Sequence, residues 1–144
     1  MEILLALAIT LAVEVNLFML LDYKNLKLFI LVSIINIVTN ITMNVILLLA
    51  NNDALYYIIL SLFEGGVIFL EAFFVFLFLK YKYTRCLFFS LIANVTSFLV
   101  GLLINQFTLN ETTKLILSIS FLTVYFIGLT IFSIIASNEY LKRE

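Results

Sequence analysis

The stretch "FEGGVIFLEA" (Phe63–Ala72) places two glutamates, Glu64 and Glu71, inside an apolar run that continues on both sides. An ionised carboxylate at the centre of a membrane helix costs roughly 2.5–3.5 kcal/mol on insertion scales. Acidic residues at that depth therefore face the protein interior or water rather than lipid. The stretch predicts a membrane helix with a buried acidic side.

The whole chain has the composition of an integral membrane protein. Its 144 residues are 65% hydrophobic and 12% charged, with a mean hydropathy of +1.22, whereas soluble domains are about a quarter charged. It has no histidine and one cysteine, which argues against a usual zinc site or an iron–sulfur cluster. We predict no metal, no cofactor, no nucleic-acid partner and, without a nucleophile–base set, no enzyme activity.

Five apolar segments of about 19 to 25 residues follow one another along the chain. About 20 apolar residues suffice to cross the hydrocarbon of a bilayer as a helix. We therefore predict an all-α integral membrane protein that forms a single transmembrane domain over residues 1–144. Its five predicted transmembrane helices are Ile3–Leu21, Leu28–Ala50, Leu55–Leu79, Cys86–Phe107 and Leu115–Ser137.

The basic residues predict the orientation of these helices. With five crossings, the first loop, the third loop and the C-terminal tail lie on one face of the membrane. These segments carry Lys24, Lys27, Lys80, Lys82, Arg85, Lys142 and Arg143. Because Lys and Arg gather on the cytoplasmic side, we predict a multi-pass protein of the cell membrane with its N-terminus outside and its C-terminus in the cytoplasm.

Polar residues inside the segments are spaced as stripes along one face of a helix. One stripe advances by three, four and four residues, and the other by four, three, four and four. Such a stripe in a membrane helix turns towards neighbouring helices or a wet cavity. The two stripes are Ser33, Asn36, Asn40 and Asn44, then Ser90, Asn94, Ser97, Gly101 and Asn105.

Four of the polar residues share one depth. At about 1.5 Å per residue, Glu14, Asn36, Glu71 and Asn94 all lie on the order of 12–14 Å from the predicted cytoplasmic ends of their helices. Two further residues, Asn40 and Ser97, lie nearer the midplane, and Glu64 lies in the half that faces the exterior. This shared depth predicts a polar layer across the bundle.

The same residues suggest an internal repeat. A shift of 57 residues places Glu14 on Glu71 and Ser33 on Ser90, and overlays "SIINIVTNITMN" on "SLIANVTSFLVG". We interpret this as two tandem helical hairpins, residues 1–50 and 55–107, related as a parallel repeat, with an extra helix over 115–137. The alternative is a chance alignment of apolar helices.

The acidic and amide residues lead to a hypothesis for function. We expect Glu14, Glu71, Glu64, Asn36, Asn40, Asn94 and Ser97 to bind or translocate a small solute, cation or proton. A purely structural hydrogen-bonded layer is the alternative role for these residues. Gly65 and Gly66 either weaken their helix beside Glu64 or allow close helix packing.

The expected partners are the lipid bilayer and either further copies of the chain or a membrane-protein complex, because five helices form a thin bundle. The alternative function is that of a non-catalytic membrane subunit or immunity-type protein. Such a protein would act by binding a partner within the bilayer.

Overall fold

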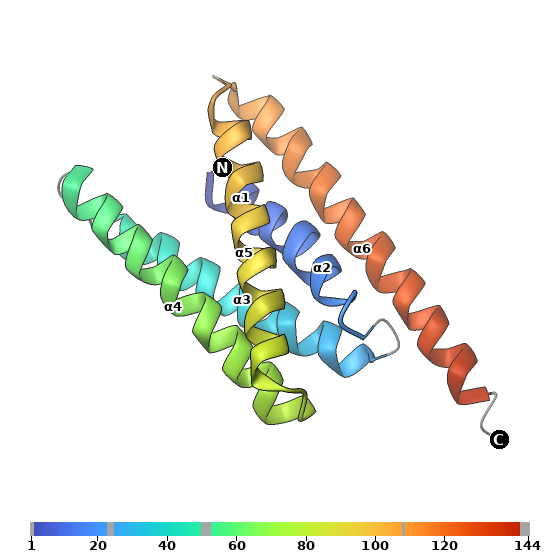
Figure 1. The fold of residues 1–144 in the computed structure, drawn as a ribbon. Coiled ribbons are helices and arrows are strands. Elements are labelled where there is room, and N and C mark those ends of the chain that lie inside the picture. The colour runs from blue at the N-terminus through green and yellow to red at the C-terminus, as the bar shows by residue number, and fades with distance from the viewer. Residues whose placement is uncertain (1, 23–24, 50–52, 108, 142–144) are drawn as a thin grey trace.

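The computed structural model describes residues 2–22, 25–49, 53–107 and 109–141 of the chain. Within them every regular element is a helix. A continuous N-terminal helix is made of α1 (Glu2–Thr10), the π-helical turn η1 (Leu11–Val15) and α2 (Asn16–Phe18). The remaining helices are α3 (Leu26–Leu47), α4 (Asp53–Leu79), α5 (Tyr83–Asn105) and α6 (Glu111–Leu141), as Figure 1 shows.

Four of the described helices are long and apolar enough to cross a membrane. They lie in α3, α4, α5 and α6, and their mean hydropathies run from 2.0 to 2.3. The N-terminal helix is apolar over Ile3–Phe18 but shorter. The fold is therefore that of a multi-pass helical membrane protein, and the first helix as a fifth crossing stays a prediction.

Four helices begin earlier than the apolar pattern predicts, and polar side chains cap two of them, α3 and α6. The predicted starts at Leu28, Leu55, Cys86 and Leu115 become Leu26, Asp53, Tyr83 and Glu111. The Asn25 Oδ1 atom accepts the backbone N–H groups of Lys27 at 3.1 Å and Leu28 at 3.3 Å. Asn110 Oδ1 likewise accepts from Thr113 N at 2.8 Å. Caps of this kind satisfy the free N–H groups of a first turn.

Helix ends also differ from the predictions. The first helix was predicted to reach Leu21, but it ends at Phe18 and the chain turns at once towards α3. The predicted ends Phe107 and Ser137 become Asn105 and Leu141. The predicted end of the second helix, Ala50, lies outside the described residues, and α3 ends at Leu47.

The glycine pair leaves α4 unbroken. The helix continues through Gly65 and Gly66, and a Cβ atom added at either position would meet nothing within 4 Å. Neither the predicted weak point nor close packing through these glycines is therefore seen.

The N-terminal helix occupies the middle of the bundle. Its α1 and η1 segments pack against α3, α5 and α6, whereas α4 packs against α3 and α5. Figure 1 shows α4 and α6 on opposite sides of this group, with α3 and α4 running away together from α5 towards the α3–α4 connection. The first helix is therefore the central element of the bundle.

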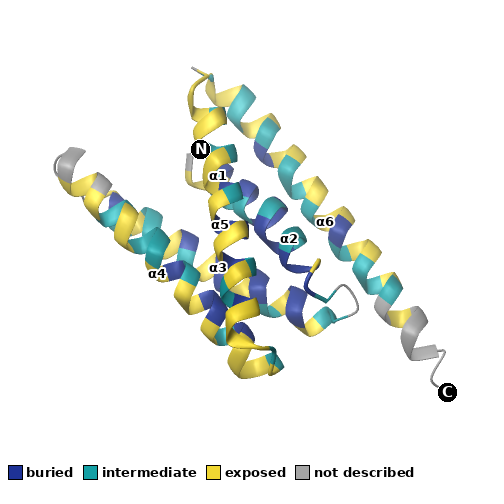
Figure 2. Cartoon of the chain, in the orientation of Figure 1, coloured by how far each residue is buried: buried dark blue, intermediate teal, exposed yellow. Residues whose placement is uncertain are grey.

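An apolar core closes one end of the bundle. We call it the apolar plug, and it gathers the buried ends of four helices (Figure 2). Burial of apolar area at about 25 cal/mol per Å² makes such a core the main source of tight packing at this end. The plug consists of Leu11, Val15, Phe18, Met19, Leu21, Leu28, Phe29, Val32, Ala72, Val75, Cys86 and Ala93.

A hydrogen-bonded network joins two connections beyond the plug, at what we call the basic end. The Tyr81 hydroxyl donates to Asp22 Oδ2 at 2.6 Å and accepts from Asn25 Nδ2 at 3.2 Å. The guanidinium Nη2 of Arg85 donates to the Leu21 carbonyl at 3.3 Å. Burial and the bond to Asp22 raise the pKa of Tyr81. The hydroxyl therefore stays protonated and keeps the α2–α3 and α4–α5 connections together.

Candidate functional site

Above the plug, Glu71 of α4 lies at the centre of a polar layer. Its side chain is fully buried. Asn36 Nδ2 of α3 donates to Glu71 Oε1 at 2.7 Å, while Asn94 Nδ2 at 2.7 Å and Ser90 Oγ at 2.8 Å, both of α5, reach Oε2. Both carboxyl oxygens are therefore hydrogen-bonded, and Glu71 links three helices across the bundle.

The two asparagines of this layer have no N–H group left over. Asn36 Nδ2 also donates to the Val32 carbonyl at 3.1 Å, and Asn94 Nδ2 also donates to the Ser90 carbonyl at 2.9 Å. An amide NH₂ group has two hydrogens, so both are used. The layer therefore holds Glu71 in one orientation.

Glu14 of η1 is buried with only one oxygen bonded. The side chain is 3% exposed, its Oε1 is hydrogen-bonded to the Ser97 hydroxyl of α5, and its Oε2 is buried without a partner among the described residues. Ser97 Oγ also lies 3.0 Å from the Asn94 carbonyl. Since a hydroxyl has one proton, the geometry suits an ionised Glu14 that accepts from Ser97 and equally a neutral Glu14 that donates to it.

A single π-helical turn, Leu11–Val15, carries Glu14. The backbone N–H of Asn16 bonds to the Val13 carbonyl instead of the Ala12 carbonyl, its partner in a regular α-helix. The Asn16 side chain donates to that Ala12 carbonyl at 2.7 Å in its place. Turns of this kind occur frequently at functional sites.

Gly128 of α6 leaves the room that Asn16 needs. Gly128 is buried, and a Cβ atom there would collide with the Asn16 side chain. An outer helix thus supports the turn that carries Glu14.

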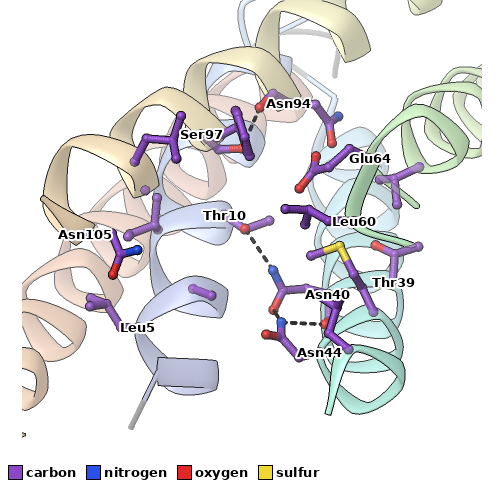
Figure 3. Close-up of a pocket in the computed structure, with 18 of the residues that line it drawn as sticks. Leu5, Thr10, Thr39, Asn40, Asn44, Leu60, Glu64, Asn94, Ser97 and Asn105 are labelled. Atoms are coloured by element: carbon purple, nitrogen blue, oxygen red, sulfur yellow. Dashed lines mark hydrogen bonds between the residues drawn. The ribbon is translucent and has the colours of Figure 1, made fainter. Parts of the chain in front are cut away.

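A cavity of about 310 Å³ lies between α1, α3, α4 and α5. At its inner end Glu14 borders it together with Asn36, Asn94 and Ser97, and Glu64 of α4 borders it as well. Figure 3 shows Glu64, Asn40 and Thr10 around the same space. The cavity extends away from the plug to Leu5, Leu47, Asn105, Leu109 and Lys114. We call this the N-terminal end of the bundle.

The structure brings most of the predicted site residues together. Glu71 contacts Asn36 and Asn94 directly, and Glu14 contacts Ser97. Glu64 borders the cavity but makes no side-chain hydrogen bond within the described part of the chain. The roles of these residues in binding stay predictions, although Glu14 and Glu71 differ clearly in their surroundings.

Several polar groups of the site were not predicted as site residues. Asn40 Nδ2 donates to Thr10 Oγ1 at 3.1 Å, although Thr10 belongs to no stripe. Ser90 and Asn44 were members of the predicted stripes, so their spacing contained the signal. The hydroxyl groups of Ser118, Ser120, Thr123 and Thr130 on α6 instead bond to carbonyls one turn earlier in the same helix.

Ser33 and Ser90, which the predicted repeat places in equivalent positions, have different surroundings in the structure. Ser90 bonds to Glu71, whereas Ser33, its counterpart under the 57-residue shift, donates to Phe29 O and accepts from Tyr125 of α6 at 3.1 Å. The tandem repeat therefore stays a prediction.

Comparison with protein-family models, with curated proteins and with solved structures finds no match to this chain. Its site is therefore interpreted from its own chemistry.

Proposed function

We propose that this membrane protein binds a small cationic solute in the cavity and moves it across the bilayer in exchange for protons. The observation that carries the proposal is the Glu14 carboxyl group, which borders the cavity and is almost completely buried. Its Oε2 has no partner within the part of the chain that the structure describes. A buried carboxylate without a partner is costly unless it is protonated or pairs with a cation. Proton and cation are thus alternative occupants of one site.

The shape of the site supports one-sided access. The cavity reaches the N-terminal end of the bundle, whereas the apolar plug fills the space between the polar layer and the basic end. A site that is open to one side at a time is what alternating access requires. The proposal places Glu14 as the exchanging group, Glu64 as a second carboxyl on the entry path and Glu71 as the anchor of the layer.

The pH dependence of cation binding is expected to reflect Glu14 and the other titratable or charged groups around it. The described groups are Glu64, Glu71 and Tyr56 of α4, Lys114 at the outer rim, and Tyr125 of α6, which bonds to Ser33; α3 and α5 contribute asparagines and a serine. A cation that displaces one proton from Glu14 binds up to about tenfold more tightly per pH unit.

The test uses the purified chain in lipid nanodiscs. Sodium, potassium, ammonium and butylammonium chlorides are added in weak buffer, and binding and proton release are measured from pH 5 to 8. We expect at least one of these cations to bind with release of close to one proton. Glu14→Gln should abolish both signals while the protein keeps its thermal stability.

Glu111→Gln is the matched control, because Glu111 is an exposed carboxyl paired with Lys114 at 3.1 Å and does not border the cavity. It should bind as the unmodified chain does. If none of the four cations binds in a Glu14-dependent way, the proposal fails, and a membrane subunit that acts through partner binding becomes the better interpretation.

A further inference from the structure

The polar groups around the cavity are mostly acceptors. The amide hydrogens of Asn36, Asn94 and Asn44 are all used within the protein, those of Asn44 by the Asn40 carbonyl and Asn40 Oδ1 at 2.8 and 3.1 Å. The Thr39 hydroxyl donates to the Ile35 carbonyl at 2.8 Å. Among the described residues, Asn40 keeps one amide hydrogen and Asn105, at the outer end, keeps two. The oxygen atoms of the lining amides and of the carboxyl groups still outnumber these free N–H groups.

An acceptor-rich cavity selects a solute that donates hydrogen bonds and carries positive charge. Its two carboxyl groups, Glu14 and Glu64, strengthen that selection. Lys114, the one basic group among the described residues that border the cavity, lies at the outer end and is paired with Glu111. An anion would meet neither free donors nor a positive charge at the inner end.

The remaining wall is apolar. Aliphatic and aromatic side chains from all four surrounding helices border the cavity beside the acceptors, so a fully hydrated inorganic ion would leave much of the wall uncovered. They include Ile9, Met43, Leu60, Val67, Phe98 and Leu102. Sites for organic molecules combine such walls with a few polar groups.

The volume limits the size of the solute. A cavity of about 310 Å³ is at the lower end of small-molecule sites. Since one water occupies roughly 30 Å³ of liquid, the space corresponds to on the order of ten heavy atoms.

From these observations, and resting on the function proposed above, we infer that the solute is a small organic monocation: one ammonium group, held by Glu14, with an apolar body that lies along the walls. Glu14 is nearly buried and borders the cavity, and its Oε2 atom has no hydrogen-bond partner among the described residues. On binding, the Glu14 proton leaves to the water at the N-terminal end, and the ammonium N–H groups form the new hydrogen bonds to the carboxylate.

A series of alkylammonium ions tests this inference. Methyl-, propyl-, butyl- and hexylammonium chlorides are titrated into nanodiscs that contain the protein. Empty nanodiscs and nanodiscs with the Glu14→Gln variant are the controls, and they measure how much of each ion partitions into lipid. We expect the Glu14-dependent affinity to rise about threefold to fourfold with each methylene group, the factor for burying one CH₂, until the cavity is filled.

A cavity-filling variant gives an independent readout. Gly101 borders the cavity, and a Cβ atom there meets nothing within 4 Å, so Gly101→Ile should fold and shorten the available space. It should weaken hexylammonium binding by about tenfold or more, because about two methylene groups are no longer buried, and weaken methylammonium binding much less. Gly66→Ile, at an exposed position outside the cavity, is the matched control and should bind both ions normally.

The outcomes separate this inference from the proposed function. An affinity that does not change along the series, or Glu14-dependent binding of sodium or potassium alone, would overturn the organic monocation and leave the proposed function standing. The absence of any Glu14-dependent cation binding would overturn both.

Discussion

At the scale of single residues, two buried glutamates have different surroundings. Glu71 has hydrogen bonds at both oxygens, whereas Glu14 has one bonded oxygen and one that no described residue contacts by a hydrogen bond. A fully bonded carboxyl group contributes to stability, because removal of a partner leaves buried polar groups unsatisfied. A half-bonded one that borders a cavity is available to a ligand. The same change should therefore reduce stability at Glu71 and reduce cation binding at Glu14.

Glu71→Gln is expected to destabilise the protein by about 1–3 kcal/mol, the cost of an unsatisfied buried group. A glutamine places its NH₂ group against Asn36 or Asn94, whose own NH₂ groups are held by the carbonyls of Val32 and Ser90. The measurement is thermal unfolding of both variants in the same detergent.

The free energy of unfolding of Glu14→Gln should lie within a few tenths of a kcal/mol of that of the unmodified chain, because the second oxygen of Glu14 has no bond to lose. Equal losses of stability in the two variants would show that both carboxyl groups are structural. That result would remove the reason to regard Glu14 as the binding group.

At the scale of elements, the N-terminal helix depends on α6. The π-helical turn that carries Glu14 is completed by the Asn16 side chain, and Gly128 leaves the room for that side chain. The short helix is therefore held in its irregular form from outside, by the helix that lies furthest from it in sequence.

Gly128→Ala should disturb the turn and weaken Glu14-dependent cation binding by about tenfold, because the added methyl group forces Asn16 away from the Ala12 carbonyl and overpacking typically costs 1–3 kcal/mol. Binding in nanodiscs and thermal unfolding are the measurements. Gly66→Ala is the matched control, since a Cβ atom there meets nothing within 4 Å, and it should leave both unchanged. Normal binding by Gly128→Ala would show that the turn is formed without support from α6.

At the scale of the whole molecule, one end of the bundle contains the cavity and the other is filled by the apolar plug. The cavity opens towards the N-terminal end, the polar layer follows, and the apolar plug fills the space before the basic end. Water should therefore reach residues along one helix from one side only, and α5 crosses all three zones.

Thiol labelling checks this arrangement with a single variant. In Gly101→Cys the new thiol borders the cavity, while the native Cys86 on the same helix is fully buried in the plug. A membrane-impermeant thiol reagent should modify residue 101 faster than Cys86 by about tenfold or more, because reaction requires an accessible thiolate. Equal rates at the two positions would contradict a dry plug.

Adding the reagent to one side of oriented proteoliposomes also tests the predicted orientation. If the N-terminus lies outside, residue 101 reacts from the outer side. Reaction only from the inner side would reverse the prediction made from the basic loops.

Much of the architecture follows from local pattern. Apolar runs predict the membrane helices, and the four long helices agree with the predictions apart from their ends. The starts of α3 and α6 differ because the caps Asn25 and Asn110 bring polar residues into a first turn, which hydropathy does not register. The spacing of the stripes predicts that Asn36 and Asn94 face inward, since lipid cannot hydrogen-bond them, and the cost of a carboxylate in hydrocarbon predicts the same for Glu71.

The sequence by itself determined that the chain is helical and suited to a membrane, because backbone polar groups in hydrocarbon must be satisfied within helices. It also predicted one depth for Glu14, Asn36, Glu71 and Asn94, because a helix rises by a fixed distance per residue. Only the tertiary structure decided which carboxyl group is satisfied and which is not, because that depends on the donors that other helices bring near. It also decided that the first helix is central and that a cavity ends at Glu14, because helix packing and the space left by it are properties of several segments together.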